Sequence, residues 1–372
     1  AALRGATGSR TGAALGRGAP PPRAPRPPGP GLRVRGASAH NLADLDVDVP
    51  GGVLGVVTGV SGSGKSTLLR DVIAASLAAG RPVGCRSLDG AERFGAVRTA
   101  RALAAALPET ATPASLGGAF DAIRACFART PEARARGLKP GDFSWNGRGG
   151  CSGCGGRGTV TTALDFLPDV TVPCERCRGR RYEGSILEVL VDDLSVADVL
   201  ELTCAEAAVR FAAQPRIAAP LQGLVRAGLG YLRLGQSAAT LSGGERSRLA
   251  LALELGARPP AGHGPGADPA PGTLYLLDEP TAGLHTDDVA ALLALLQQLV
   301  DAGHTVLCVD HHLDLVAAAD WVIDLGPEGG PGGGRLVCAG PPAAVTGCAA
   351  SHTGRALGAW LGRATAPSAA PR

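Results

Sequence analysis

Short apolar runs along the chain predict the strands of an α/β fold. The run 53–59 is apolar and ends in a glycine-rich turn, as a buried strand does, and residues 66–79 follow with helical spacing. Three further runs alternate with helical segments: 273–279, 305–310 and 321–326. Strands that alternate with helices in this way predict the sheet of an α/β nucleotide-binding fold.

Shifts in composition divide the chain into expected segments. Residues 1–32 are rich in Gly, Pro and Arg and predict a linker with little structure of its own, and 81–140 are alanine-rich and mostly helical in pattern. Residues 258–272 predict a disordered insert. The expected segments are a linker (1–32), the first part of a core (33–80), a helical insertion (81–140), a cysteine-bearing module (141–185), a glycine-signature region (186–260), the second part of the core (261–345) and a C-terminal tail (346–372).

Composition narrows the class of protein. With 45% hydrophobic and 19% charged residues among 372, the chain is neither disordered nor fibrous. No run approaches the roughly 20 apolar residues of a membrane helix, so no membrane association is expected. The net charge of +3 means that any affinity for nucleic acid must come from local patches. The chain lacks methionine, even at position 1, and is expected to be a fragment or a processed product.

One motif predicts a phosphate site. Residues 59–67 fit G-x-x-x-x-G-K-[ST] between a predicted strand and a predicted helix. In this pattern backbone N–H groups surround the phosphates, Lys65 reaches the β- and γ-oxygens, and Ser66 offers a hydroxyl to Mg²⁺. A chance glycine-rich turn is the plain alternative, which the flanking elements disfavour. The motif predicts ATP and Mg²⁺ as ligands of Gly59, Gly62, Gly64, Lys65, Ser66 and Thr67.

The run 273–279 ends in two acidic residues, Asp278 and Glu279. Asp278 is predicted to hold Mg²⁺, and Glu279 to polarise the attacking water. An apolar run followed by two acids is common, so this interpretation depends on the phosphate motif in the same chain.

A second glycine motif, Leu241-Ser-Gly-Gly-Glu245, precedes a periodic helix. The N–H groups at a helix start can meet a γ-phosphate, although Ser242 could equally be an ordinary N-cap. After the run 305–310, His311 is a candidate contact to the γ-phosphate, on its position alone.

These four motifs together resemble the ABC ATPase family. In that family two nucleotide-binding domains meet head to tail, and each ATP lies between the phosphate loop of one and the signature of the other. The resemblance implies an ABC-type P-loop ATPase domain with an inserted helical signature region. It also implies that Ser242, Gly243 and Gly244 serve a site whose lysine belongs to another domain.

Four of the ten cysteines form two C-x-x-C pairs separated by 19 residues: Cys151, Cys154, Cys174 and Cys177. This spacing predicts a closed, structural Zn²⁺ site with four thiolate ligands. The N-terminus has no apolar signal core, so a reducing cytoplasm is favoured over a secreted disulfide protein; an organelle transit peptide is a weaker alternative. The flanking residues are candidates for contact with a phosphate backbone, unless they form a merely solvated face: Arg148, Arg178, Arg180, Arg181 and Tyr182.

A zinc module between a P-loop and an LSGGE signature resembles the UvrA family of bacterial excinuclease subunits. Similar segments lie along nearly the whole chain: 9–18, 40–52, 120–124, 143–146, 166–182, 228–245, 278–285 and 319–330. The resemblance implies the C-terminal half of a two-ABC protein of nucleotide excision repair. Such a protein would bind double-stranded DNA, pair with another ATPase half or a second copy, and work with a UvrB-like helicase subunit.

The chain departs from the family pattern before Phe120. There the family carries a glutamine that senses Mg²⁺ and the attacking water, and counting back from Phe120 puts Ala102 at that position. The signature helix also reads ERSR in place of the family's EAQR. ATP binding is still expected, whereas hydrolysis is expected to be reduced.

Three hypotheses follow from these motifs. The first is a DNA-binding, UvrA-like ATPase that scans for lesions. The second is the ATPase subunit of a membrane exporter, against which the zinc module argues. The third is a divergent relative, for example a paralogue linked to resistance against DNA-binding drugs, in which ATP fixes geometry without efficient hydrolysis; Ala102 favours this one slightly.

Overall fold

The computed structural model describes residues 23–108, 110–164, 167–257 and 272–365. These described residues form two compact units, one from those within 1–106 and 243–372 and the other from those within 107–242. The chain therefore leaves the first unit and returns to it, which fits the expected α/β core interrupted by an insertion. No helix within the described ranges is long and apolar enough to cross a membrane.

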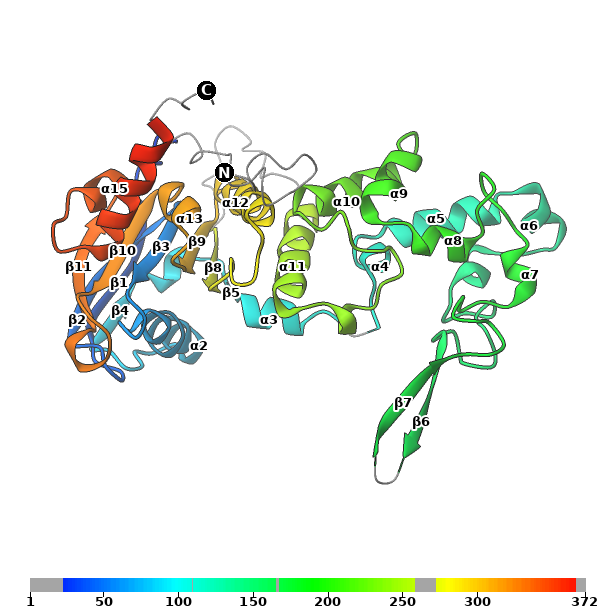
Figure 1. Ribbon diagram of the computed structural model, residues 1–372, viewed down its shortest axis with the longest axis horizontal. Coiled ribbons are helices and arrows are strands. Elements are labelled where there is room, and N and C mark those ends of the chain that lie inside the picture. Colours follow the sequence, from blue (N-terminus) through cyan, green and yellow to red (C-terminus); the bar gives the residue numbers. More distant parts are fainter. Residues whose placement is uncertain (1–22, 109, 165–166, 258–271, 366–372) are drawn as a thin grey trace, which may run out of the picture. The chain divides into compact units, whose positions relative to one another are not determined.

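A six-stranded sheet forms the centre of the first unit, in the order β11-β10-β3-β9-β8-β5 (Figure 1). Its five strands from β10 to β5 are parallel, and β11 is antiparallel to β10. The bounds are β3 Leu54–Gly59, β5 Ala96–Thr99, β8 Thr273–Asp278, β9 Thr305–Val309, β10 Trp321–Gly326 and β11 Arg335–Gly340. Strands β3, β8, β9 and β10 confirm the four predicted apolar runs. Since both faces of a parallel sheet are covered, such strands are apolar at consecutive positions.

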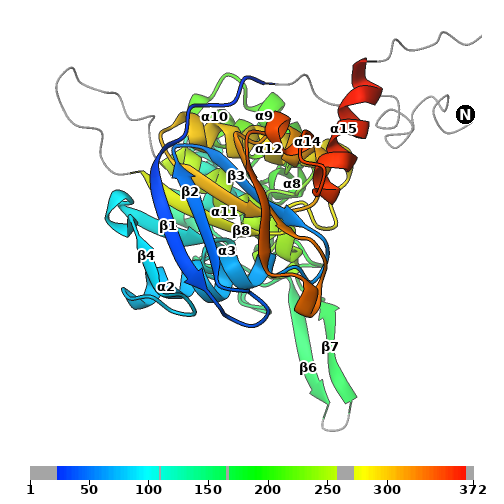
Figure 2. The same ribbon diagram turned by 90° about the vertical axis from the view of Figure 1, so that its left-hand side faces the viewer.

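A smaller antiparallel sheet, in the order β2-β1-β4, lies beside the central one (Figure 2). Its strands are β1 Gly29–Ala37, β2 Leu45–Gly51 and β4 Ser87–Asp89. The helix after the phosphate loop begins as a π-helix, Thr67–Ala74, and continues as α2, Ala75–Ala79. Leu68, Leu69, Val72 and Ile73 of this helix are buried in one cluster with residues of both sheets. The helix therefore has little freedom to move away from the loop that precedes it.

The remaining helices of the first unit pack around the central sheet. They are α3 Ala100–Ala105, α11 Gly243–Ala257, α12 Thr286–Asp301, α13 Leu313–Ala317, α14 Pro342–Thr346 and α15 His352–Thr365. Helix α12 contacts β9 and β3 along its buried side, and α11 contacts α3 and α12.

The second unit is mostly helical, with a two-stranded hairpin. Its helices are α4 Pro113–Leu116, α5 Ala119–Ala128, α6 Pro131–Ala135, α7 Gly184–Leu187, α8 Val196–Glu201, α9 Cys204–Arg210 and α10 Pro215–Arg226. The hairpin consists of β6 Thr159–Leu164 and β7 Leu167–Pro173, and within this unit it extends away from the helices (Figure 1). Val160, Val170 and Val172 of the hairpin are exposed.

Three expectations need correction. Strands β4 and β5 lie in the stretch 81–140 that was expected to be mostly helical, because four residues of an edge strand leave little apolar signal among alanines. Strand β1 begins at Gly29, inside the expected linker. Arg26, in the same segment, forms an ion pair with Asp320. The expected tail, 346–372, contains the helix α15, whereas α14 ends at Thr346, the first residue of that range. The predicted insert 258–272 lies outside the described residues except for Gly272.

Candidate nucleotide and metal sites

The phosphate loop joins β3 to the helix at Thr67, as the motif predicts. Gly59 has φ +135°, and a Cβ atom there would lie 2.0 Å from the carbonyl oxygen of Leu325 on the neighbouring strand. Gly64 has φ +96°, and a Cβ there would lie 2.7 Å from Leu42. These positions therefore admit only glycine, and the loop stays close to β10.

Lys65 folds back over this loop. Its ammonium donates to the carbonyl oxygens of Gly59, at 3.0 Å, and Val60, at 2.7 Å. Half-burial lowers the pKa of Lys65, while the negative charges of Glu279, Asp324 and Asp278 act to raise it. The charges of three carboxylates thus act on the Lys65 ammonium, whose N–H groups could donate to a phosphate in place of the two carbonyls.

Ser66 and Asp278 meet at the ends of neighbouring elements. The hydroxyl of Ser66 lies 3.1 Å from Asp278 Oδ1 and donates to it. The other carboxylate oxygen of Asp278 pairs with Arg70 Nε at 3.3 Å. A hydroxyl and a carboxylate side by side are hard oxygen ligands of the type that Mg²⁺ takes together with phosphate oxygens. The residues present therefore fit MgATP.

Glu279 leaves the end of β8 in an unusual conformation. Its N–H donates to the carbonyl oxygen of Val309 at 2.8 Å, and its φ of +46° is rare for a residue other than glycine. Its side chain is exposed. Backbone strain of this kind gathers at functional sites, and here it fixes where the carboxylate leaves the sheet edge.

Asp310, which motif analysis missed, organises the end of β9. Its buried carboxylate accepts hydrogen bonds from the N–H groups of His311, at 2.7 Å, and His312, at 2.9 Å. It also accepts from the hydroxyl and the N–H of Thr281, two residues after Glu279. Asp310 therefore connects the candidate base to the candidate sensor. An acid directly after a buried strand was its only signal in the sequence.

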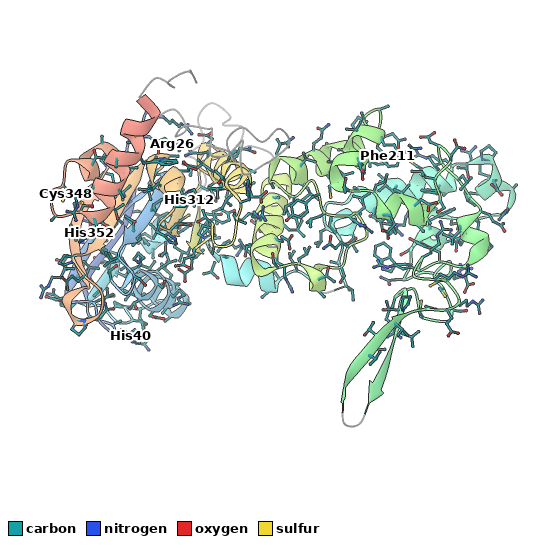
Figure 3. The ribbon with its side chains drawn as sticks, in the orientation of Figure 1. Arg26, His40, Phe211, His312, Cys348 and His352 are labelled. Carbon is teal, nitrogen blue, oxygen red and sulfur yellow. The ribbon has the colours of Figure 1, made fainter. Side chains whose placement is uncertain are left out.

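The two neighbouring histidines have different environments. His312 Nδ1 accepts from the N–H of Asp314 at 3.3 Å and caps α13 (Figure 3). His311 has an exposed side chain, so it is the one of the two available to a ligand. The signature residues Ser242, Gly243 and Gly244 lie at the start of α11, which begins at Gly243 as predicted.

The four cysteines of the two C-x-x-C pairs lie together and are buried. The sulfur atoms of Cys151 and Cys174 are 4.0 Å apart, and those of Cys154 and Cys177 are 3.7 Å apart. Sulfurs on a tetrahedral zinc ion, with bonds of about 2.3 Å, are about 3.8 Å apart, whereas a disulfide needs about 2.05 Å. The N–H of Gly158 donates to Cys154 Sγ at 3.2 Å. The cluster therefore fits zinc.

The expected basic rim of this module is smaller than predicted. Arg180 pairs with Asp198 at 2.8 Å, and Arg181 lies 5.8 Å from the ring centre of Trp145 and donates to the carbonyl oxygen of Gly235. Tyr182 is 1% exposed, so it lies inside the unit and cannot contact DNA. Arg148, Arg178 and Arg180 are exposed. The plain alternative thus explains part of the cluster, since Arg181 serves an internal contact and Arg180 forms a surface ion pair with Asp198.

Comparison with known proteins identifies the family. UvrABC system protein A of Micrococcus luteus is 48% identical over 340 residues, or 89% of this chain, and that of Thermus thermophilus is 48% identical over 339 residues. The chain belongs to the UvrA family. It spans 33% and 34% of these two relatives, about a third of their length.

A solved UvrA structure shows the same fold. UvrA2 from Deinococcus radiodurans matches with a TM-score of 0.81 and 43% identity over 96% of this chain and 43% of that chain. The expected α/β, ABC-type fold with an inserted helical region and a four-cysteine module is confirmed. No family model matches the chain.

The segment that departs from the UvrA pattern forms a short helix. Helix α3 follows β5 directly, and its start is capped by Thr99, whose hydroxyl accepts from the N–H of Ala102 at 3.2 Å. Ala102, at which a glutamine was expected from the resemblance, is exposed and offers no side-chain polar atom. Arg246, in the ERSR stretch of the signature helix, donates to the carbonyl oxygen of Ala104 on α3 at 3.3 Å. The two segments that are expected from the sequence to differ from the family therefore contact each other.

Proposed function

We propose that the chain binds MgATP at the phosphate loop, hydrolyses it, and uses its nucleotide state to control a grip on duplex DNA. The observation that carries this proposal is the 3.1 Å hydrogen bond between Ser66 Oγ and Asp278 Oδ1. It brings the hydroxyl of one motif to the carboxylate of another, 212 positions away in the sequence.

The roles of the residues follow from where they lie. Bound Mg²⁺, held by Ser66 and Asp278, would neutralise charge on the β- and γ-phosphate oxygens. Lys65 would exchange its two loop carbonyls for phosphate oxygens, and backbone N–H groups from Gly59 to Thr67 would surround the phosphates.

Glu279 would accept the proton of the water that attacks the γ-phosphorus, while the bond to the leaving ADP oxygen breaks. His311 would contact the γ-phosphate from the end of β9. Asp310 would keep both groups in place, since it accepts from the backbone N–H groups of Thr281 and His311.

The signature residues would complete a second site in another ATPase domain. Ser242, Gly243 and Gly244 lie at a helix start, where free N–H groups favour a phosphate. The partner would be a UvrA N-terminal half or a second copy of this chain. The exporter hypothesis gains no support from the relatives, which are named as UvrABC system proteins.

A Zn²⁺ ion on Cys151, Cys154, Cys174 and Cys177 would be structural, because four thiolates leave no open position. Duplex DNA would be the ligand of the second unit, with Arg148 and Arg178 as exposed cations near the zinc module. A cytoplasmic role in nucleotide excision repair of damaged DNA, as the ATPase partner of a UvrB-like helicase, agrees with these assignments.

A second candidate function has a specific observation in its favour. Ala102 cannot position water or Mg²⁺ as the family's glutamine does, and α3 occupies that segment. In this alternative ATP binding alone sets the DNA-binding geometry and turnover is very slow, as in a divergent paralogue.

The test of the DNA proposal is fluorescence anisotropy of a labelled duplex, damaged or intact, without nucleotide, with ATP and with ADP. We expect the DNA affinity to differ between ATP and ADP. Arg178→Ala should lower the slope of log affinity against log salt concentration by about one phosphate contact. Arg180→Ala should lower it less, because the exposed Arg180 also pairs with Asp198. Equal affinity in all three nucleotide states would contradict the proposal.

A further inference from the structure

The C-terminal segment of the first unit is bonded to the strand that carries the phosphate loop. Asp324 lies on β10 directly beside Thr58 of β3, the residue before Gly59. Its carboxylate is 2% exposed, and both of its oxygens accept hydrogen bonds from the start of α15. Ser351 Oγ donates to Oδ2 at 2.6 Å, and Thr353 Oγ1 donates to Oδ1 at 3.0 Å.

Each hydroxyl in this cluster donates one hydrogen bond in a direction that its single proton fixes. A hydroxyl has one proton, and that of Thr353 goes to Asp324, so the 3.3 Å contact between Thr58 Oγ1 and Thr353 Oγ1 requires Thr58 to donate. Ser351 gives its proton to Asp324 and accepts from the N–H of Gly354 at 2.7 Å. The chain of bonds therefore runs unbroken from β3 through Thr353 and Asp324 to the first turn of α15.

We infer that Thr58, Asp324, Ser351 and Thr353 form a positioning network that makes α15 part of the nucleotide site. The network holds the last residue of β3 before the loop, and Asp324 adds a buried negative charge that acts on Lys65. Figure 3 labels His352, which lies between the two hydroxyl residues at the start of α15. None of these four residues belongs to the phosphate motif, so their role is to place the loop that follows Thr58.

The placement argues against a purely structural role. Burying a carboxylate with two hydroxyls gives little net stability, since each must leave water, and an apolar cluster would pack as well. A satisfied polar network instead selects one arrangement of the groups that it joins. Here those groups are the start of α15 and Thr58, the residue that precedes Gly59. The backbone of Gly59 itself lies too close to Leu325 to admit a side chain.

The experiment removes one hydroxyl at nearly constant volume. Thr353→Val deletes the bond to Asp324 and the acceptor of Thr58, and Thr353→Ser keeps both. Thr346→Val is the matched control, because the hydroxyl of the half-buried Thr346 donates to the backbone oxygen of Ala343, within its own helix. The full chain is titrated with Mg²⁺ and a fluorescent N-methylanthraniloyl ATP, and the melting temperature is recorded without nucleotide.

We expect Thr353→Val to raise the Kd for this nucleotide by roughly fivefold to tenfold, the loss of about one hydrogen bond. Thr353→Ser and Thr346→Val should stay within about twofold of the unmodified chain. In steady-state assays the KM for ATP should rise with kcat unchanged. If Thr353→Val does not fold, Thr58→Val, which keeps a β-branched residue in a strand, should raise the Kd by about threefold.

An unchanged Kd in Thr353→Val would overturn the inference. If Thr353→Val does not fold, an unchanged Kd in Thr58→Val would do so. An equal rise of the Kd in the control Thr346→Val would also overturn it. The inference rests on the proposed function, and the two fail in different ways. If the unmodified chain does not bind the nucleotide, both are wrong. If the unmodified chain binds it and Thr353→Val binds it equally well, the positioning network alone is wrong.

Discussion

Arg246 of the signature helix donates a hydrogen bond to the backbone oxygen of Ala104 on α3, 3.3 Å away. Both residues belong to segments that are expected from the sequence to depart from the UvrA pattern. Helix α3 begins where β5 ends, at the same sheet edge as Asp278 and Glu279. The contact links the signature helix to the segment in which a glutamine was expected from the family resemblance.

Arg246→Ala should uncouple α3 from α11. Because Arg246 bonds α3, outside the phosphate motif, we expect the Kd for MgATP to stay within about twofold. We expect kcat for hydrolysis to fall about threefold to tenfold, the effect of losing one charged hydrogen bond. Steady-state assays of the full chain measure both values. Arg33→Ala, at an exposed position of β1, is the control and should change neither. A loss of affinity in Arg246→Ala with kcat intact would show that the contact serves binding instead.

Arg26 ties the segment before β1 to the core. It donates through its guanidinium to Asp320, which is 2% exposed, at 2.7 Å, and through its N–H at 2.8 Å. Arg26→Ala should lower the free energy of unfolding by about 2 kcal/mol. The variant loses the guanidinium, so the buried carboxylate of Asp320 keeps only backbone N–H donors and no charged partner. Arg23→Ala, at a half-exposed surface pair, should cost no more than about 0.5 kcal/mol. Urea denaturation measures both, and equal effects would refute the distinction.

This stabilisation should depend on pH at its acidic end. The hydrogen bond from Arg26 lowers the pKa of Asp301 below its ordinary value of 3.8. A carboxyl with a lowered pKa in the folded state stabilises the protein above its unfolded pKa and loses that contribution as the pH falls through the folded value. The difference between the unmodified chain and Arg26→Ala should therefore shrink below about pH 4. A difference that grows in acid would contradict this sign.

Zinc binding should depend on the four clustered cysteines. Elemental analysis of the purified chain should find one zinc ion per chain, and Cys154→Ser should lose it because three thiolates bind zinc far less tightly than four. Cys85→Ser is the control, since Cys85 lies in the first unit, whereas all four clustered cysteines belong to the second. Zinc content unchanged in Cys154→Ser would contradict the assignment.

Local sequence predicts the parts of this protein whose cause is local. The runs at β3, β8, β9 and β10 are apolar because both faces of each strand are buried, so the central sheet could be foreseen. The phosphate loop could be foreseen because its glycines are required by backbone geometry at fixed spacing.

The remaining features depend on partners far apart in the sequence. The role of Asp310 depends on Thr281, and that of Asp324 on Ser351 and Thr353, so neither acid carries a motif. The ion pair of Arg180 could not be foreseen either, because its partner Asp198 lies 18 residues further along the chain. Strand β5 depends on its pairing with β8, and its four residues form no apolar run.

The most direct test of the account is steady-state ATP hydrolysis by the purified chain over a range of protein concentrations, with Glu279→Gln as the background. The account predicts that turnover per chain rises with concentration, as composite sites form between two copies, and that Glu279→Gln lowers it by roughly a hundredfold or more, as expected for loss of a general base. A chain that binds MgATP yet hydrolyses it no faster than Glu279→Gln at any concentration would contradict the account.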